Sequence, residues 1–522
     1  MSGVLRTLGG DLVVVDNAAR EGALGTTIAS VAADEPEDFG AIVLRDSNDA
    51  ALIGQAADGS VSLRLSLWSL NNAQLHASAA EVRGAFGQYN VLRSTTTVDP
   101  VSGQPTQVRF FSYDDADGQT YNALQKRVSF TDTALIDGNE PLPIYAVYGQ
   151  SNVSDVFGGA PVETAARYPT KHVMFSANSA FNGASSAVLD GSTQQDILPA
   201  SDAGRTSQSL FIMAATAQEA LGVAAEERSQ GGLHLCVFEG GQQLPAFEQG
   251  TNNYTNLMTA YERAVEVAAD YGRSAQVKIL TLVQGEAGPF TRSTYDTTLQ
   301  AIVGDLVTDI KAITGQVADP CVFVWQTNIG AAATANEAQL GQWDATEALT
   351  STTRLVGPMY QFPLVDEGAT DIHLTAASRM MQGATEADAR RRYLADDFTP
   401  VKPVSAIRSG TTVVVTFDGP GALSFDADWV LAATDYGFGW EGASATISSV
   451  TITDTLEVTI ELSTGEAGVL TYARTRDDQN TWASRRGQLM HQTSTVNPFY
   501  TLGYTVPQYI RHYCIVFEMD VS

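Results

Sequence analysis

The sequence predicts an α/β domain in the middle of the chain, flanked by two β-rich regions. Between residues 144 and 397, short apolar runs alternate with long amphipathic segments. Parallel strands with covering helices produce this alternation. On either side, stretches of residues alternate between apolar and polar with the period of half-buried strands. We therefore predict three domains, over residues 1–140, 141–397 and 398–522.

Each central element has its own pattern. Buried strands are expected over 144–149, 233–238, 277–283 and 321–325, where apolar residues run without interruption. Ligands of such folds bind beyond the carboxyl ends of the strands. The polar groups that follow these strands, at 149–151, 240–241, 284–286 and 326–328, are thus expected at one edge. Two helices are expected from apolar faces made of Tyr254, Leu257, Tyr261, Ala264, Val265 and Ala268, and of Tyr295, Leu299, Ile302, Leu306, Ile310 and Ile313.

The flanking regions carry strand patterns and no recognisable chemistry. Strands are expected near 61–67 and 107–113, and glycine and proline at 138–143 indicate a boundary. His76 has no nearby carboxylates or histidines, so we interpret residues 1–140 as an attachment or assembly domain. A second boundary at 398–403 precedes strands that predict a small β-sandwich. Residues 497–522 either finish that sandwich or pack on another subunit.

Composition excludes several classes of partner. The formal net charge is −29 over 522 residues, which repels phosphate backbones and anionic lipid headgroups. We expect no nucleic-acid binding and no membrane insertion, since no apolar run approaches 18 residues and none near the N-terminus suits a signal peptide. The protein is expected to be soluble as made. Cys236, Cys321 and Cys514 are predicted to be buried free thiols, because neither their number nor their spacing suits disulfides or zinc.

Ser151 is the candidate nucleophile. It follows the predicted strand 144–149 by two residues, after Gly149 and Gln150. A tight turn there presents a hydroxyl at the sheet edge, and a base must take its proton before it attacks. A serine in this position can also simply cap the next helix.

His373 is the candidate base. It follows Asp371 by two residues and precedes a helix expected from near Ala376. An imidazole there can take the proton of Ser151 and later return it to a leaving alcohol. Asp371 is placed to hold the ring tautomer. A surface or structural histidine is the alternative.

Donors for an oxyanion are available beyond two other strands. Gln284 follows the strand 277–283, and its side-chain amide can donate a hydrogen bond. Gly241 offers an unobstructed backbone N–H, and the N–H of Ser151 is a third donor. Each is worth about 3 kcal/mol of transition-state stabilisation where it operates. Taken singly, each segment also fits a plain turn.

A family resemblance joins these motifs. Gly149-Gln150-Ser151-Asn152, Gln284-Gly285-Glu286 and Asp371-Ile372-His373-Leu374, with Gly240-Gly241-Gln242 between them, resemble the sialate O-acetylesterase-like branch of the SGNH (GDSL-type) hydrolases. The resemblance covers about residues 144 to 395. It implies a flavodoxin-like three-layer hydrolase that removes acyl groups, often acetyl, from carbohydrates without a metal or organic cofactor. It also implies Ser151 as nucleophile, His373 as base, and Gly241 with Gln284 as oxyanion hole.

Two positions depart from the family pattern. Many members place the acid three residues before the histidine, where this chain has Thr370, and Asp371 lies two before. Glu286, Asp366, Glu367 or a backbone carbonyl are therefore alternatives for orienting the ring. Gly288 replaces the acidic or asparagine residue often found two after the glutamate, which leaves the substrate contacts at that position open. Asn152 and Glu286 are separate candidates for contacting the substrate or orienting the catalytic groups.

The layout of the whole chain suggests a setting. Residues 468–474 and 486–489 resemble the β-module that follows such hydrolases in bacteriophage virion proteins. We expect an esterase for acylated cell-surface polysaccharide in a phage tail or capsid surface, with other virion proteins as partners. The flanking regions are expected to mediate homo-oligomer assembly, for instance as a trimer. The alternative is a binding or structural virion protein that kept the fold with little or no catalysis.

Overall fold

The computed structural model divides into two compact units, Met1–Asn139 and Glu140–Ser522. In the second unit it describes residues 141–153, 160–168, 171–175, 181–182, 197–202, 207–225, 231–270, 273–328, 337–364, 373–442, 444–474 and 486–522. In the first unit it describes the backbone of strands only. The α/β region and the C-terminal β-region thus belong to one unit.

The first unit contains antiparallel strands in three small sheets. Their orders are β1-β2, β3-β4-β5 and β6-β7-β8. The strand expected near 107–113 lies within β7, and the start of that expected at 61–67 lies in β5. His76 lies outside the described residues. The strands are β1 (Ser2–Arg6), β2 (Leu12–Asp16), β3 (Phe39–Arg45), β4 (Ala51–Ala56), β5 (Val61–Leu63), β6 (Gln88–Val98), β7 (Pro105–Asp114) and β8 (Thr120–Arg127).

A mixed sheet forms the centre of the second unit. Its order is β12-β10-β13-β9-β14-β15-β16, with the short β11 also paired to β13. The strands β10, β13, β9, β14, β15 and β16 are parallel to one another. Strand β12 pairs antiparallel with β10 at the edge of the sheet. The strands are β9 (Leu142–Gly149), β10 (His172–Phe175), β11 (Phe181–Asn182), β12 (Ile197–Pro199), β13 (Gly232–Phe238), β14 (Ala275–Val283), β15 (Cys321–Gln326) and β16 (Thr353–Pro358).

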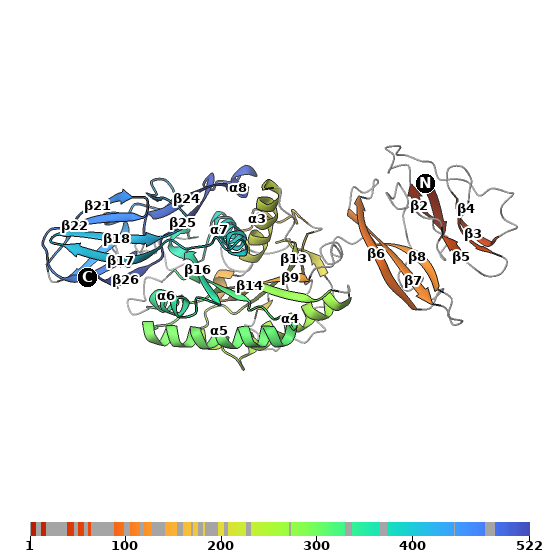
Figure 1. The fold of residues 1–522 in the computed structure, drawn as a ribbon, viewed down its shortest axis with the longest axis horizontal. Coiled ribbons are helices and arrows are strands. Elements are labelled where there is room, and N and C mark those ends of the chain that lie inside the picture. Colours follow the sequence, from red (N-terminus) through yellow and green to blue (C-terminus); the bar gives the residue numbers. More distant parts are fainter. Residues whose placement is uncertain are drawn as a thin grey trace. The chain divides into compact units, whose positions relative to one another are not determined.

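Helices cover both faces of this sheet, which gives three layers (Figure 1). The helices α3 and α7 pack together on one face, and α4, α5 and α6 lie on the other. Helix α5 has a complete pair of caps, because Thr291 accepts a hydrogen bond from the Thr294 N–H and Gly315 ends the helix at φ 70°. The helices are α3 (Leu210–Ala224), α4 (Asn252–Asp270), α5 (Arg292–Thr314), α6 (Ala338–Ala348) and α7 (Ala376–Leu394).

The strand order reverses direction around β9. The chain adds β10 and β13 on one side of β9 and then crosses to add β14, β15 and β16 on the other. In open α/β sheets the crevice at such a reversal, beyond the carboxyl ends of the strands, is where ligands bind. The end of β9, at Gly149, therefore lies at the expected position for a site.

The C-terminal β-region consists of antiparallel sheets around a shared apolar core. Residues 497–522 are part of it, since β25 pairs with β24 and β26 with β23, which decides between the two alternatives for this stretch. Its elements are β17 (Lys402–Ser409), β18 (Thr412–Asp418), β19 (Leu423–Phe425), β20 (Phe438–Gly442), β21 (Ile447–Asp454), β22 (Glu457–Leu462), β23 (Gly468–Tyr472), β24 (Leu489–Val496), α8 (Pro498–Thr501), β25 (Tyr509–Tyr513) and β26 (Phe517–Asp520).

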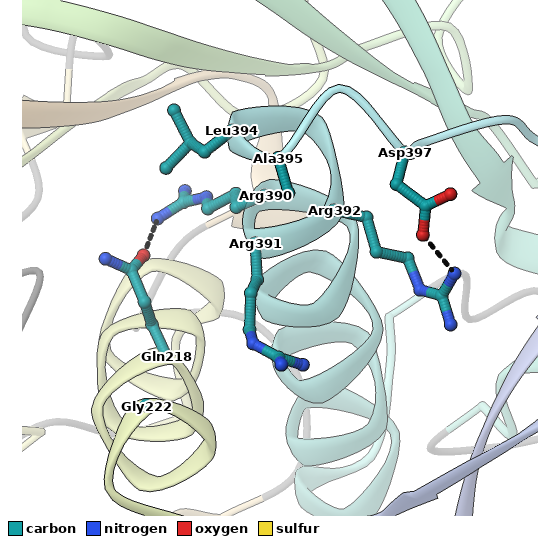
Figure 2. Close-up of a pocket in the computed structure, with 8 residues that line it drawn as sticks. All are labelled: Gln218, Gly222, Arg390, Arg391, Arg392, Leu394, Ala395 and Asp397. Carbon is teal, nitrogen blue, oxygen red and sulfur yellow. Dashed lines mark hydrogen bonds and ion pairs between the residues drawn. The ribbon is translucent and has the colours of Figure 1, made fainter. Parts of the chain in front are cut away.

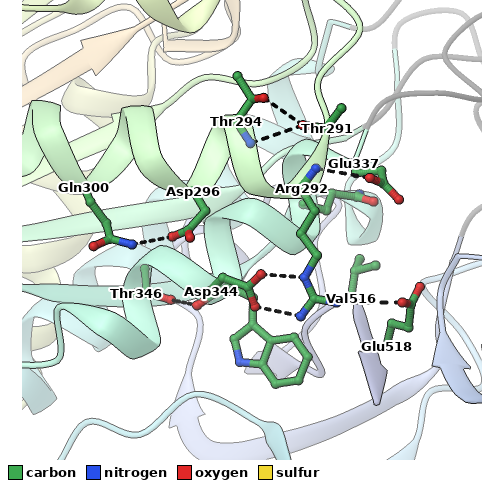
Figure 3. Close-up of polar contacts among 12 residues, drawn as sticks. Thr291, Arg292, Thr294, Asp296, Gln300, Glu337, Asp344, Thr346, Val516 and Glu518 are labelled. Atoms are coloured by element: carbon green, nitrogen blue, oxygen red, sulfur yellow. Dashed lines mark hydrogen bonds and ion pairs between the residues drawn. The ribbon is translucent and has the colours of Figure 1, made fainter. Parts of the chain in front are cut away.

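Polar contacts fasten this β-region to the α/β layers. The side chain of Gln326 pairs with the backbone of Val516, donating at 2.8 Å and accepting at 2.6 Å. Arg292, at the start of α5, binds Asp344 of α6 through two nitrogens and lies 3.7 Å from Glu518 of β26 (Figure 3). The contacts of Gln326 and Arg292 thus join the C-terminal β-region to the α/β layers.

The main central elements agree with the sequence prediction. Strands lie at 144–149, 233–238, 277–283 and 321–325, and both expected helical faces lie in α4 and α5. The helix expected near Ala376 begins there. All three cysteines are buried and free, as predicted. Among the described residues, no helix combines the length and the apolar character needed to cross a bilayer.

Candidate active site

The turn after β9 can form only because residue 149 is glycine. Gly149 has φ +147°, and a Cβ atom there would lie 1.9 Å from the Val283 carbonyl oxygen on β14. The backbone instead continues the sheet, since Gln150 N–H donates to that oxygen at 3.0 Å. The chain then enters a single 3-10 turn, Ser151–Val153, which places Ser151 at the carboxyl end of the sheet with 4% of its surface exposed.

The structure brings Ser151 and His373 together. The Ser151 Oγ and His373 Nε2 atoms lie 3.0 Å apart, although 222 positions separate the residues in sequence. His373 is half-buried. This distance is the reach that transfer of the serine proton to the ring requires.

Local structure fixes the segment that carries His373. The next residue, Leu374, forms an antiparallel bridge with Leu364, and Thr375 donates its N–H to the Pro363 carbonyl at 3.2 Å. Thr375 is also the N-cap of α7, since its hydroxyl accepts from the Ser378 N–H at 3.1 Å. The imidazole is therefore anchored one residue from a bridge and two residues from a capped helix.

Glu286 ties down both neighbours of the serine. Its Oε1 accepts from the Asn152 side-chain amide at 2.9 Å, and its Oε2 accepts a short hydrogen bond from the Gln150 amide. All three side chains are buried. A carboxylate has lone pairs for both donors at once, so this one group holds the turn on each side of Ser151.

Arg379 of α7 completes this buried cluster. Its Nη2 donates to Asn152 Oδ1 at 3.1 Å and its Nη1 to Gln382 at 3.1 Å. Burial raises the pKa of Glu286, while the Asn152 hydrogen bond and the Arg379 charge act in the opposite direction. Burial lowers the Arg379 pKa to about 10, against the attraction of Glu286. The guanidinium thus remains charged at neutral pH and supports the carboxylate that holds the turn.

Gln284 and Gly241 lie on turns that the structure connects. The amide of Gln284, which is fully buried, donates to the Gln242 carbonyl at 3.1 Å and so holds the turn carrying Gly241. Gln284 is itself held by the Tyr295 hydroxyl, which donates to its side-chain oxygen at 2.8 Å. Gly241 is exposed, with φ +73°. Their assignment to an oxyanion hole stays a prediction.

The local structure explains why residue 288 is glycine. Its φ is +99°, and a Cβ atom there would lie 2.9 Å from the Gln243 side chain, on the turn that carries Gly241. Any side chain at 288 would strain the backbone and displace that neighbour. Glycine at position 288 therefore lets this turn pack closely against the turn that carries Gly241.

The acidic partner of His373 is left open. Asp371, Asp366 and Glu367 lie outside the described residues, as does Thr370. The choice among them, Glu286 and a backbone carbonyl stays a prediction. Within the described ranges, no cluster of histidine, cysteine and acidic side chains is suited to hold a metal ion.

A pocket of about 390 Å³ lies elsewhere, between the last turns of α3 and α7 (Figure 2). It is lined by Gln218, Arg390 and Arg391 among others. Arg390 lies 14 residues beyond the start of α7, about 21 Å along the helix axis at 1.5 Å per residue. This pocket is therefore remote from Ser151, and its arginines face helix C-termini, where positive charge is ordinarily favoured.

Arg379 and Gln382 belong to the site although the sequence gives no direct signal for them. In the sequence, Arg379, Gln382, Glu386 and Arg390 recur at helical spacing, which ordinarily indicates a solvent-facing stripe. The structure buries this stripe: none of the four is more than 1% exposed. Only the polar groups that it meets on the sheet and on the serine turn explain its burial.

Comparisons with known proteins give structural similarity alone. A scan against protein-family models found no match, and neither did a search of curated proteins. A carbohydrate acetylesterase from Xanthomonas citri aligns over 83% of this chain and 92% of its own, with TM-score 0.46 and 14% identity. A carbohydrate acetylesterase from Sinorhizobium meliloti covers 49% of this chain and 100% of its own, with TM-score 0.29 and 11% identity.

An aryl esterase from M. smegmatis is similar over 48% of this chain and 98% of its own, with TM-score 0.29 and 11% identity. All three TM-scores lie below 0.5. The functional assignment consequently depends on the geometry of the site and not on these similarities.

Proposed function

We propose that this protein is a serine esterase that removes O-acyl groups, in particular O-acetyl groups, from carbohydrate. The observation that carries the proposal is the 3.0 Å separation of Ser151 Oγ and His373 Nε2 at the carboxyl end of the sheet. The buried amides and carboxylate around Ser151 support it, because they hold the serine turn on both sides. The carbohydrate part of the proposal comes from the sequence motifs.

The reaction follows from the two side chains. The Ser151 oxygen attacks the ester carbonyl carbon while His373 Nε2 takes the serine proton. The negative charge that develops on the carbonyl oxygen is bound by N–H donors, for which Ser151, Gly241 and Gln284 are the candidates. Expulsion of the alcohol, protonated by His373, leaves an acyl-serine. Water then attacks this ester with His373 as base, and the acid is released.

Ser151→Ala tests the assignment. Without its hydroxyl no acyl-enzyme forms, so we expect release of acetate from O-acetylated xylan and of 4-nitrophenol from 4-nitrophenyl acetate to fall by at least about 10³-fold. Ser449→Ala, which changes an exposed serine of β21, is the matched control and should keep full activity. A Ser151→Ala variant that retains the wild-type rate contradicts the proposal.

A location in a phage tail or capsid surface, with homo-oligomeric assembly through the flanking regions, remains part of the proposal. It is supported by the resemblance of residues 468–474 and 486–489 to a virion β-module and by the acidic composition. Light scattering of the intact chain tests the assembly. We expect a mass of two or more times the 55.5 kDa of one chain, and a mass equal to one chain contradicts the assembly.

A further inference from the structure

A pocket of about 160 Å³ lies where the C-terminal β-region meets the sheet edge. One wall comes from the ends of β15 and β16, with Asn328, Gln361 and Pro363. The other comes from the β-region, with Trp429 and Arg486. Leu364 and Leu431 also line it.

This pocket adjoins the candidate catalytic histidine. Leu364, in its lining, forms the antiparallel bridge to Leu374, which directly follows His373. Facing Cα atoms of such a bridge lie about 5 Å apart and consecutive ones 3.8 Å, so the backbones of Leu364 and His373 are within about 9 Å. The Leu364 side of the pocket therefore adjoins the chain segment that carries His373.

The wall from the β-region is held rigidly. The carboxylate of Asp426 accepts the Trp429 N–H at 3.2 Å and the Val430 N–H at 2.6 Å. The Tyr513 hydroxyl and the Arg511 guanidinium donate to the same carboxylate at 2.7 Å and 3.0 Å. The Trp429 indole in turn donates to the Gln361 carbonyl at 3.1 Å, across the two regions. A wall fixed in this way loses little entropy when it binds a ligand.

The chemistry of the lining combines an aromatic ring with polar side chains. Asn328 is 3% exposed, and no hydrogen bond joins it to another described residue. Gln361 is 2% exposed, and its side-chain oxygen has no hydrogen-bond partner within the described ranges. An alkyl chain in the pocket would leave such groups unsatisfied, at a cost of about 1–3 kcal/mol each. A sugar ring offers hydroxyls to the amides and a C–H face to the indole.

We propose that this pocket binds the sugar ring of the leaving group, so that the C-terminal β-region supplies part of the substrate site. The inference rests on the proposed function and specifies its substrate class. In this arrangement the sugar ring stacks on the Trp429 indole, and its hydroxyls contact Asn328 and Arg486. The acyl group lies towards Ser151. The β-region is thereby part of the enzyme's specificity and not a separate module.

Trp429→Ala, measured on two classes of substrate, tests this inference. The substrates are mono-O-acetylated glucose, galactose and xylose on one side, and 4-nitrophenyl acetate, which has no sugar, on the other. We expect kcat/KM on at least one acetylated sugar to fall about tenfold or more, mainly through KM, and to change less than about twofold on 4-nitrophenyl acetate. Leu431→Ala, at an exposed residue of the same lining, is expected to give a smaller loss of about threefold with the same selectivity.

The matched control is Trp440→Ala, because Trp440 is a partly buried tryptophan of the same β-region outside the pocket lining. It should not separate the two classes of substrate. Equal losses on both classes in Trp429→Ala and Leu431→Ala, or no loss in either, overturn the inference. So does a wild-type protein that cleaves 4-nitrophenyl acetate and none of the acetylated sugars.

Two further measurements separate a sugar pocket from an acyl-chain pocket, and a failure of the pocket from a failure of the esterase assignment. If Trp429→Ala raises KM for 4-nitrophenyl butyrate and not for the acetylated sugar, the pocket holds the acyl chain and the inference fails. Ser151→Ala identifies a failure at the level of the proposed function: wild-type rates in that variant remove the esterase itself. Serine-dependent hydrolysis that is indifferent to Trp429 and Leu431 removes only the sugar pocket.

Discussion

His373 and the pair formed by His172 and His234 lie at opposite ends of the central sheet. His373 is half-buried beyond the carboxyl end, with a serine hydroxyl 3.0 Å away. His172 and His234, near the strand beginnings, are buried with their rings joined by a 2.8 Å hydrogen bond. Only the first arrangement offers a nucleophile to a substrate.

The electrostatic surroundings of the buried pair show what it does instead. Burial lowers the pKa of both rings, most strongly for His234, where the charges of His172 and Arg390 add to the effect. Glu219, 3.6 Å from His172, opposes the shift there. His234 stacks on Tyr145, whose ring also lies beneath the Arg390 guanidinium and whose hydroxyl accepts from the Gln218 amide at 3.0 Å. The lowered pKa values keep both imidazole rings uncharged at neutral pH, and the rings are packed in the interior, away from any substrate.

Helix α7 links the two regions through its buried polar stripe. Arg379, near its start, contacts the serine turn through Asn152. Glu386, two turns on, accepts from Thr281 at 2.6 Å and from the Trp325 indole at 2.8 Å on the sheet. Arg390, near its end, reaches Tyr145. The same residue types thus serve a candidate catalytic turn at one end and a structural cluster at the other.

The largest expected effect separates the two kinds of histidine. His373→Ala removes the base, so we expect kcat to fall by at least about 10³-fold, with the free energy of unfolding changed by less than about 1 kcal/mol. Steady-state kinetics and urea unfolding measure the two quantities. His491→Ala, at a partly exposed histidine of β24, should leave kcat unchanged. A His373→Ala variant with wild-type kcat contradicts the role of His373 as the catalytic base.

An intermediate effect is expected from Glu286→Gln. One oxygen of the carboxylate is replaced by an N–H₂ donor, which then faces the amide donor of Gln150 or Asn152. The serine turn loses one of its two anchors, and kcat is expected to fall about 10- to 100-fold with little change in KM. The control is Glu266→Gln on the exposed face of α4, with no expected effect. A change confined to KM contradicts a positioning role.

The smallest effect concerns the buried pair and pH. Because both histidine pKa values are lowered in the folded state, the unfolded chain binds protons that the folded one does not. Their contribution to stability is present above pH 6.5, the ordinary value, and is lost as the pH falls below it. The slope approaches about 1.4 kcal/mol per pH unit for each ring that remains neutral.

His234→Phe tests that slope. The variant removes one titrating ring and leaves the Nδ1 atom of His172 without its partner, so it should cost about 1–3 kcal/mol at pH 7.5. Its unfolding free energy should also fall less steeply between pH 6.5 and 5. Glu286, with a raised pKa, gives an opposite slope in both proteins, so the difference between them isolates the pair. Equal slopes in the two proteins contradict this account.

The sequence predicted the elements that have local patterns and missed those that depend on contacts. Uninterrupted apolar runs located β9, β13, β14 and β15, and the turn motif located Ser151. The strands β10, β12 and β16 have weaker patterns and were not predicted. Their place in the sheet is set by pairing with distant strands.

The candidate site divides in the same way. Ser151 and His373 were predicted from their motifs, and the structure places them in hydrogen-bond reach. The contacts of Glu286 with Gln150 and Asn152 could not be predicted, because they join residues more than 130 positions apart. Trp429 carries no signal in the sequence, since its place beside the sheet edge depends on how two regions dock.

The central claim is that Ser151 is a nucleophile activated by His373. Wild-type protein, Ser151→Ala and His373→Ala are incubated with a serine-reactive fluorophosphonate, and the modified residue is identified by peptide mass spectrometry. The account predicts a single adduct on Ser151 in the wild-type protein, strongly reduced in His373→Ala and absent in Ser151→Ala. An unmodified Ser151, or labelling that does not depend on His373, would contradict it.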